Sequence, residues 1–265
     1  KTGSRLPRAY HRLVLRFITV SLRHQGRIVL DAVTMEARAG ELVVIEGGRA
    51  AGKTTLLEIA GARRRPDSGS IRIAGHDVTA LQRDSLPFVR RNVGYVEPHP
   101  QFLGGATVLE NVMLPLAARV ETLAWARDAA LRALGKVGIV GAATVAPETL
   151  STSARRLVGI ARALAGSPPL IVIDDPSGSL TAADTGAVLS ALLGAIENGA
   201  TVICATGDGA FAAAAARAGA RRLRLEAGCL LGGPTPLTLL SAARGTKQGA
   251  DDSSARVTGR QGGLP

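Results

Sequence analysis

A glycine-rich segment with the spacing of a phosphate-binding loop is the clearest chemical feature of the chain. Its residues are Gly47, Gly48, Arg49, Ala50, Ala51, Gly52, Lys53, Thr54 and Thr55. In the pattern G-x-x-x-x-G-K-[ST], backbone N–H groups converge on phosphate oxygens and a helix N-terminus adds positive potential. We expect Lys53 to reach the terminal phosphates and the Thr54 hydroxyl to coordinate Mg²⁺. In a chain with 32 glycines the alternative is a chance match, which the flanking sequence must exclude.

A carboxylate farther along the chain is the second candidate metal ligand. Asp174 ends the apolar run Leu-Ile-Val-Ile-Asp at residues 170–174. Such a run is common as a simple strand terminus, so it is weak evidence by itself. Together with the phosphate loop, it leads us to expect Asp174 to face the Mg²⁺ held by Thr54.

The loop requires a strand before it and a helix after it. Residues 42–45 are apolar and predict a buried strand, and residues 55–60 predict the helix. Residues 170–174 and 201–206 predict parallel strands, with a helix over residues 181–197 between them. This order of elements argues against a chance match.

Most of the chain resembles one family, the ATP-binding cassette (ABC) ATPase subunits of transporters. The matching segments are residues 30–34, 40–41, 59–61, 66–71, 93–96, 107–112 and 160–165, within about residues 13–231. Residues 107–115 are most similar to the lipoprotein-releasing, macrolide-exporting and cell-division subgroup. The resemblance implies an α/β P-loop NTPase of ABC type, in which a mixed sheet core carries an antiparallel β portion and a helical insertion. It also implies ATP and Mg²⁺ as cofactors, and integral membrane transporter subunits and a second ABC ATPase subunit as partners.

Positions that in this family approach the Mg²⁺ or the γ-phosphate depart from its pattern. The family's Gln after residues 95–96 aligns with Pro98, and its switch His aligns with Gly207. The signature Leu-Ser-Gly-Gly-Gln reads Leu-Ser-Thr-Ser-Ala over residues 150–154 and loses both glycines. Ser151 remains, and the resemblance implies that it donates to a γ-phosphate across a dimer interface.

The catalytic segment departs in the same way. Asp175 aligns with the family's Glu that polarises the attacking water, and it is one methylene shorter. A carboxylate withdrawn by about 1 Å can lower a rate on the order of a hundredfold. The family's dimer-linking Asp aligns with Thr181, and Ala50 replaces a loop glycine, which adds about 1 kcal/mol of strain if its φ is positive. The chain is thus expected to keep nucleotide binding and to lose most hydrolysis.

The adenine site has a single candidate residue. Family members stack the base on an aromatic side chain near the end of the first strand, where His24 aligns. An imidazole can stack with less area than Tyr, and an exposed turn histidine is an equally good interpretation.

Composition fits one α/β domain. The chain has 265 residues, 46% of them hydrophobic, and lacks an apolar stretch of about 18 residues that would predict a membrane span. Its net charge of +11 is spread along the chain and only 3% of residues are aromatic, which argues against nucleic acid as a partner. The two cysteines lack metal-site spacing and are expected to be reduced thiols. We expect a cytoplasmic protein, peripheral on the inner face of the cell membrane through partner subunits.

The domain organisation follows from the same patterns. Residues 1–12 are expected to be a basic N-terminal extension without an apolar leader core, and residues 13–244 the ATP-binding domain. Within the domain, a helical insertion is expected at about residues 86–166, with its clearest helix over residues 121–134. The polar stretch of residues 245–265 predicts a disordered tail.

Two functions of different class remain open. In the first, the chain is a degenerate cassette that binds Mg-ATP beside a more active cassette and membrane subunits. In the second, it is an active homodimeric ATPase that uses Asp175 to power transport. The number of departures favours the first.

Overall fold

The fold is taken from a computed structural model that describes residues 13–117 and 122–233. The expected N-terminal extension, Glu121 and the expected tail at residues 245–265 lie outside the described residues, as do residues 234–244.

A six-stranded sheet with the order β10-β9-β3-β8-β7-β6 forms the centre of the described domain. Its strands are β3 (Leu42–Glu46), β6 (Val93–Val96), β7 (Leu170–Asp174), β8 (Thr201–Thr206), β9 (Arg221–Glu226) and β10 (Cys229–Leu231). All neighbouring pairs are parallel except β10 with β9, so the sheet is mixed, as predicted. Along β3, Val43 and Ile45 pack in one apolar cluster and Val44 in the other. Because both faces are buried, the strands read as continuous apolar runs.

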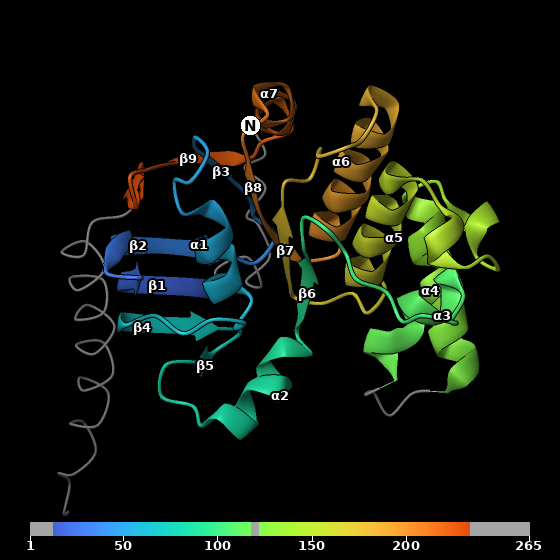
Figure 1. The fold of residues 1–265 in the computed structure, drawn as a ribbon, viewed down its shortest axis with the longest axis horizontal. Coiled ribbons are helices and arrows are strands. Elements are labelled where there is room, and N and C mark those ends of the chain that lie inside the picture. Colours follow the sequence, from blue (N-terminus) through green and yellow to red (C-terminus); the bar gives the residue numbers. More distant parts are fainter. Residues whose placement is uncertain (1–12, 118–121, 234–265) are drawn as a thin grey trace, which may run out of the picture. The chain divides into compact units, whose positions relative to one another are not determined.

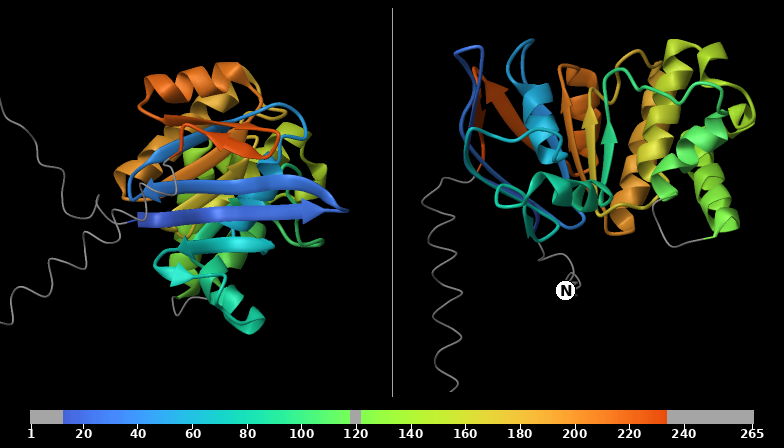
Figure 2. Two further views of the ribbon diagram at one scale, coloured as in Figure 1. Left: turned by 90° about the vertical axis from the view of Figure 1, so that its left-hand side faces the viewer. Right: turned by 60° about the horizontal axis from the view of Figure 1, so that its bottom comes forward.

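One face of this sheet is covered by the phosphate-loop helix α1 (Lys53–Ala60) and by an antiparallel sheet (Figure 1). The antiparallel sheet has four strands in the order β2-β1-β4-β5. They are β1 (Leu13–His24), β2 (Arg27–Arg38), β4 (Ser68–Ile73) and β5 (His76–Asp77). The left view of Figure 2 shows β1, β2 and β4 side by side. The short helix α2 (Leu86–Arg90) follows this sheet and precedes β6.

The other face is covered by helices, as the right view of Figure 2 shows. They are α3 (Val108–Met113), α4 (Leu123–Lys136), α5 (Thr152–Leu164), α6 (Ala182–Glu197) and α7 (Gly209–Arg217). Short 3₁₀ turns lie at Arg83–Ser85, Leu114–Leu116, Val140–Ala142 and Pro147–Thr149. Each of the five helices begins after a Ser, Thr or Asp whose side chain accepts a backbone N–H bond, which fixes its starting point.

The helix boundaries differ from the predicted ones by about one turn or less. The helix α1 begins at Lys53 rather than residue 55, because Gly52 is its N-cap and Lys53 and Thr54 form its first turn. Thr122 caps α4, which starts at Leu123 and extends to Lys136, two residues beyond the predicted end. The segment expected as a helical insertion, residues 86–166, includes β6 of the central sheet as well as helices.

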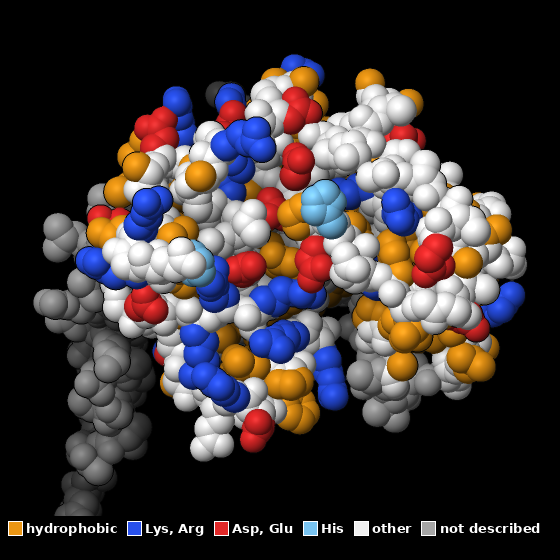
Figure 3. All heavy atoms as spheres, viewed as in Figure 1, with side chains coloured by type: hydrophobic (Ala, Val, Ile, Leu, Met, Phe, Trp, Pro, Cys, Tyr) orange, Lys and Arg blue, Asp and Glu red, His pale blue; other side chains and the backbone are white. Residues whose placement is uncertain are grey.

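Charged side chains of both signs are interspersed over the surface shown in Figure 3. Arg16 pairs with Glu36 and Arg64 pairs with Glu58, each at 3.1 Å. Of the two cysteines, Cys204 is buried in β8 and Cys229 is exposed, and both are free. No helix within the described ranges is both long enough and apolar enough to cross a membrane.

Candidate functional site

The phosphate loop, Asp174 and Gly207 lie at one edge of the central sheet. The strands β3, β6, β7 and β8 are parallel, so their carboxyl ends share this edge. The phosphate loop follows β3, Asp174 ends β7, and Gly207 follows β8. Open α/β sheets bind their ligands at this edge.

The phosphate loop wraps around the amino group of Lys53. Its Nζ donates to the carbonyl oxygens of Gly47 and Gly48, each at 2.7 Å. Gly52 has φ +100°, and a Cβ there would lie 2.6 Å from the Val29 carbonyl oxygen, so glycine is required. The exposed residues in the rest of the loop are Gly48, Arg49, Ala50 and Thr54. Ala51 is buried and Thr55 is half-buried. The loop therefore offers exposed backbone and a cation at the N-terminus of α1.

Ala50 occupies a backbone conformation that favours glycine. Its φ is +59°, which meets the condition for the strain expected from the sequence. An L-residue with a side chain costs about 1 kcal/mol or more in this region. The phosphate loop therefore carries backbone strain at Ala50, which glycine would not have.

Thr54 and Asp174 meet at this edge of the sheet. The Thr54 hydroxyl donates to Asp174 Oδ2 at 2.6 Å. Asp174 is 4% exposed, and this burial raises the pKa of its carboxyl group, while the hydrogen bond from Thr54 acts to lower it. A hydroxyl and a single carboxylate fit Mg²⁺, which binds hard oxygen ligands and takes others from phosphates.

The Asp175 carboxylate points into its own turn. Its backbone has φ +55°, and its N–H donates to the Ala205 carbonyl oxygen at 2.8 Å. A Cβ placed on Gly178 would lie 2.4 Å from Asp175 Oδ2, so the carboxylate packs against the Gly178 backbone. This position is where the sequence predicted a doubtful catalytic base.

Gly207 faces the phosphate loop without a side chain. A Cβ at this position would lie 3.9 Å from the Gly47 carbonyl oxygen, and no other described atom beyond the two adjacent residues would be within 4 Å. The next residue, Asp208, caps α7 by accepting from the N–H of Ala210 at 2.8 Å. A hydrogen bond from Ser177 is the main cause that lowers the pKa of Asp208. Residue 207, where the switch histidine was expected, therefore has space for a side chain beside the phosphate loop.

Ser151 lies at the start of α5, across the sheet from α1 (Figure 1). Its exposed hydroxyl oxygen accepts the Ala154 N–H at 3.2 Å and is 3.0 Å from the Ser153 Oγ. Thr181, the position of the family's dimer-linking Asp, caps α6 by accepting the Asp184 N–H at 3.1 Å. The described residues thus do not bring Ser151 to the phosphate loop of its own chain.

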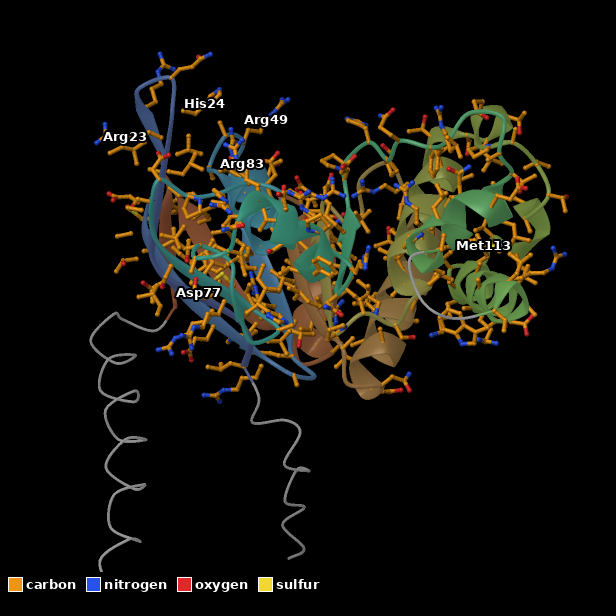
Figure 4. All side chains as sticks on the ribbon, turned by 90° about the horizontal axis from the view of Figure 1, so that it is seen from below. Arg23, His24, Arg49, Asp77, Arg83 and Met113 are labelled. Atoms are coloured by element: carbon orange, nitrogen blue, oxygen red, sulfur yellow. The ribbon has the colours of Figure 1, made fainter. Side chains whose placement is uncertain are left out.

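His24 is exposed at the end of β1, where it pairs with Arg27 across the hairpin. Figure 4 shows His24 at the tip of this hairpin and Arg49 toward the same edge of the view. The hairpin tip therefore leaves the imidazole accessible.

Arg156 is a buried cation that the sequence analysis did not identify. It is 3% exposed, and its Nη1 donates to the carbonyl oxygens of Glu97 and Pro98 at 2.5 and 2.7 Å. Its Nη2 donates to the carbonyl oxygens of Asp174 and Asp175. Burial lowers the pKa of Arg156, and the two nearby aspartates oppose this effect. Arg156 thus connects α5, the segment of Glu97 and Pro98, and the end of β7 that carries the candidate metal ligand Asp174.

Comparison with known proteins assigns the family. The family model described as ABC transporter matches residues 30–178. The lipoprotein-releasing system ATP-binding protein LolD of Chromohalobacter salexigens is 37% identical over 191 residues, covering 71% of this chain and 81% of that protein. The cell division ATP-binding protein FtsE of Escherichia coli K12 is 35% identical over 196 residues, covering 74% and 88%. Both relatives come from the subgroups that the sequence resembles.

A solved structure agrees with this assignment. The dimeric structure of MJ0796, a bacterial ABC transporter cassette, superimposes with a TM-score of 0.76 at 30% identity, covering 82% of this chain and 96% of that one. The predicted fold, an α/β P-loop cassette with a mixed sheet, is confirmed. The chain therefore belongs to the ABC transporter family, as a cassette of its ATPase type.

Proposed function

We propose that this chain binds Mg-ATP at the phosphate loop and hydrolyses it slowly, as a degenerate cassette of an ABC transporter. The observation that carries the proposal is the contact of Thr54 with Asp174, which unites the two predicted metal ligands. In this proposal Lys53 exchanges its bonds to the loop carbonyls for the terminal phosphates. Bound Mg²⁺ would neutralise phosphate charge, and His24 is available to stack on the base.

The proposed slow hydrolysis rests on three residues at the carboxyl edge of the central sheet that lack the side chains this reaction needs. Pro98 and Gly207 provide no polar side chain, and the Asp175 carboxylate packs against the Gly178 backbone. Hydrolysis needs a positioned water and a stabilised transition state in addition to a bound phosphate. The chain keeps the binding residues and lacks these additional ones.

A second, more active cassette completes the proposed assembly. Ser151 is exposed on the far side of the sheet from α1, which suits a contact with nucleotide held by another subunit. A relative of similar fold is described as a dimeric post-hydrolysis state bound to ADP and Pi. We propose a heterodimer in which Ser151 of this chain serves the partner's site, while the site at Lys53 holds ATP as a persistent clamp.

A basic groove is the proposed contact for the membrane subunit. It has a volume of about 470 Å³, and Arg63, Arg91 and Arg162 line it with Glu97 as the opposing charge. Arg91 lies 5.1 Å from the ring of Phe88, which is 64% exposed. Figure 3 shows basic side chains beside hydrophobic ones over α2. An amphipathic helix with acidic residues would complement this surface, and it would hold the chain at the inner face of the cell membrane.

Removal of the loop cation tests the binding proposal. Lys53→Ala should weaken Mg-ATP binding at least tenfold, because it removes a charge-assisted contact to phosphate. Lys136→Ala is the matched control, since Lys136 ends α4 away from this edge. Isothermal titration of both variants and the wild type measures the effect. ATP affinity that is the same in all three proteins would refute binding at this loop.

A further inference from the structure

A recess lies beside the first glycines of the phosphate loop. It has a volume of about 340 Å³, and the backbone of Gly47, Gly48 and Gly207 forms part of its wall. The missing side chain at residue 207 contributes to this space, because a Cβ there would have one neighbour within 4 Å. The recess therefore lies between the end of β8 and the place in the loop where a terminal phosphate would bind.

Arg222 is held in this recess by Glu46. The two residues form a bidentate ion pair, with Nε to Oε1 at 2.5 Å and Nη2 to Oε2 at 2.8 Å. Glu46 directly precedes Gly47, and β9 runs parallel beside β3, so the pair is fixed next to the loop (Figure 1). Glu46 raises the pKa of Arg222, so the guanidinium stays charged.

The ion pair leaves donors of Arg222 available. A guanidinium has five N–H donors, and Glu46 accepts two of them. The carboxylate therefore orients the guanidinium without using all of its donors. The Arg222 side chain is 52% exposed. The neighbouring Arg224, which also lines the recess, is 70% exposed and pairs with Glu226 at 2.6 Å.

We propose that Arg222 contacts the terminal phosphate of bound ATP through the space that Gly207 leaves open. This inference rests on the proposed binding of Mg-ATP at the phosphate loop. An arginine oriented by a carboxylate presents its planar fork to phosphate oxygens with little further loss of freedom. Arg222 acts as a specificity residue that distinguishes ATP from ADP, and the phosphate loop binds the part that both nucleotides share.

The test compares ATP with ADP in a variant that removes both charges of the pair. In the double variant Glu46→Gln/Arg222→Gln, no unpaired carboxylate is left beside the loop. We expect ATP affinity to fall on the order of tenfold, while ADP affinity changes less than about twofold. Glu46→Gln alone keeps the cation and should retain most of the preference for ATP.

Arg221→Gln is the matched control on the same strand. Arg221 pairs with Glu41 at 2.5 Å and does not line the recess, so its loss should not alter the ratio of the two affinities. Titration calorimetry gives the affinities, and thermal unfolding confirms that each variant is folded. Lys53→Ala should weaken the binding of both ATP and ADP.

The outcomes separate this inference from the proposed function. If the double variant keeps the wild-type preference for ATP, or loses ATP and ADP affinity equally, the role of Arg222 is overturned while nucleotide binding stands. If the wild type binds neither nucleotide, the proposed function fails and this inference fails with it.

Discussion

The Thr54 hydroxyl donates a hydrogen bond of 2.6 Å to Asp174, across a sequence separation of 120 residues. This contact joins the first turn of α1 to the end of β7. Because Asp174 is buried, the packing of the sheet holds these two candidate metal ligands in place. If they coordinate Mg²⁺ as proposed, this arrangement reduces the cost of ordering them when Mg²⁺ and nucleotide bind.

Asp174→Asn should make the chain more stable and bind Mg-ATP less well. Burial raises the pKa of the Asp174 carboxyl group, so the folded state opposes its ionised form at neutral pH. The asparagine carbonyl can still accept from Thr54 without this charge. We expect unfolding to cost roughly 1 kcal/mol more and the melting temperature to rise about 2–4 °C.

The pH dependence gives this prediction a second readout. The pKa of Asp174 is higher in the folded state than in the unfolded state. The contribution of Asp174 to the free energy of unfolding therefore falls as the pH rises from the ordinary aspartate pKa through the raised pKa of the folded state. The wild type and Asp174→Asn should therefore have similar free energies of unfolding below the ordinary aspartate pKa. They should differ most above the raised pKa of the folded state. Thermal melts at several pH values check this, and a variant less stable than the wild type at neutral pH would contradict it.

Ala50→Gly should relieve strain in the phosphate loop. Ala50 has φ +59°, a conformation that glycine adopts without a steric penalty. The free energy of unfolding is expected to rise by less than about 1 kcal/mol, because the relieved strain is partly offset by the freedom that glycine gains in the unfolded chain. Ala51→Gly is the control: Ala51 is buried and is not among the positive-φ residues, so its substitution should bring no gain. Equal effects of the two substitutions in thermal unfolding would argue against strain at Ala50.

Asp175→Glu alone should restore little ATP hydrolysis. The Asp175 carboxylate packs against the Gly178 backbone, and Gly207 still leaves the γ-phosphate side of the loop without an imidazole. The double variant Asp175→Glu/Gly207→His should exceed either single variant, since residue 207 has space for a side chain. Steady-state phosphate release measures all three. A large gain from Asp175→Glu alone would show that the carboxylate length is the main defect.

Ser151→Ala should lower ATP turnover in a complex with an active second cassette. In the proposed heterodimer this exposed hydroxyl contacts the partner's γ-phosphate, so a loss of about tenfold in turnover is expected. Asp175→Asn should be tolerated in the same complex. Ser153→Ala is the control, because its hydroxyl lies 3.0 Å from Ser151 Oγ but is not the N-cap. Turnover that is insensitive to Ser151 and abolished by Asp175→Asn would contradict the heterodimer proposal.

The local motifs predicted much of the fold because each has a local physical cause. The apolar runs at β7 and β8 have the predicted bounds, since both faces of a central parallel strand must be buried. The meeting of Thr54 with Asp174 also followed from motif order. The boundaries of α1 and α4 shifted because caps at Gly52 and Thr122 set them.

Other site features depend on contacts between distant segments. Arg156 read as one basic residue among many, and its bonds to carbonyl oxygens of the Pro98 segment and the end of β7 become visible only in the fold. The pairing of Glu46 with Arg222 depends on the register of β9 beside β3. The direction of the Asp175 carboxylate likewise depends on the turn that follows it.

The most direct test measures Mg-ATP binding and phosphate release on the same preparation of the purified chain. We expect saturable binding that Lys53→Ala weakens, together with phosphate release close to that of the Lys53→Ala variant. Rapid phosphate release by the wild type, abolished by Asp175→Asn in a homodimer with two equivalent sites, would contradict it.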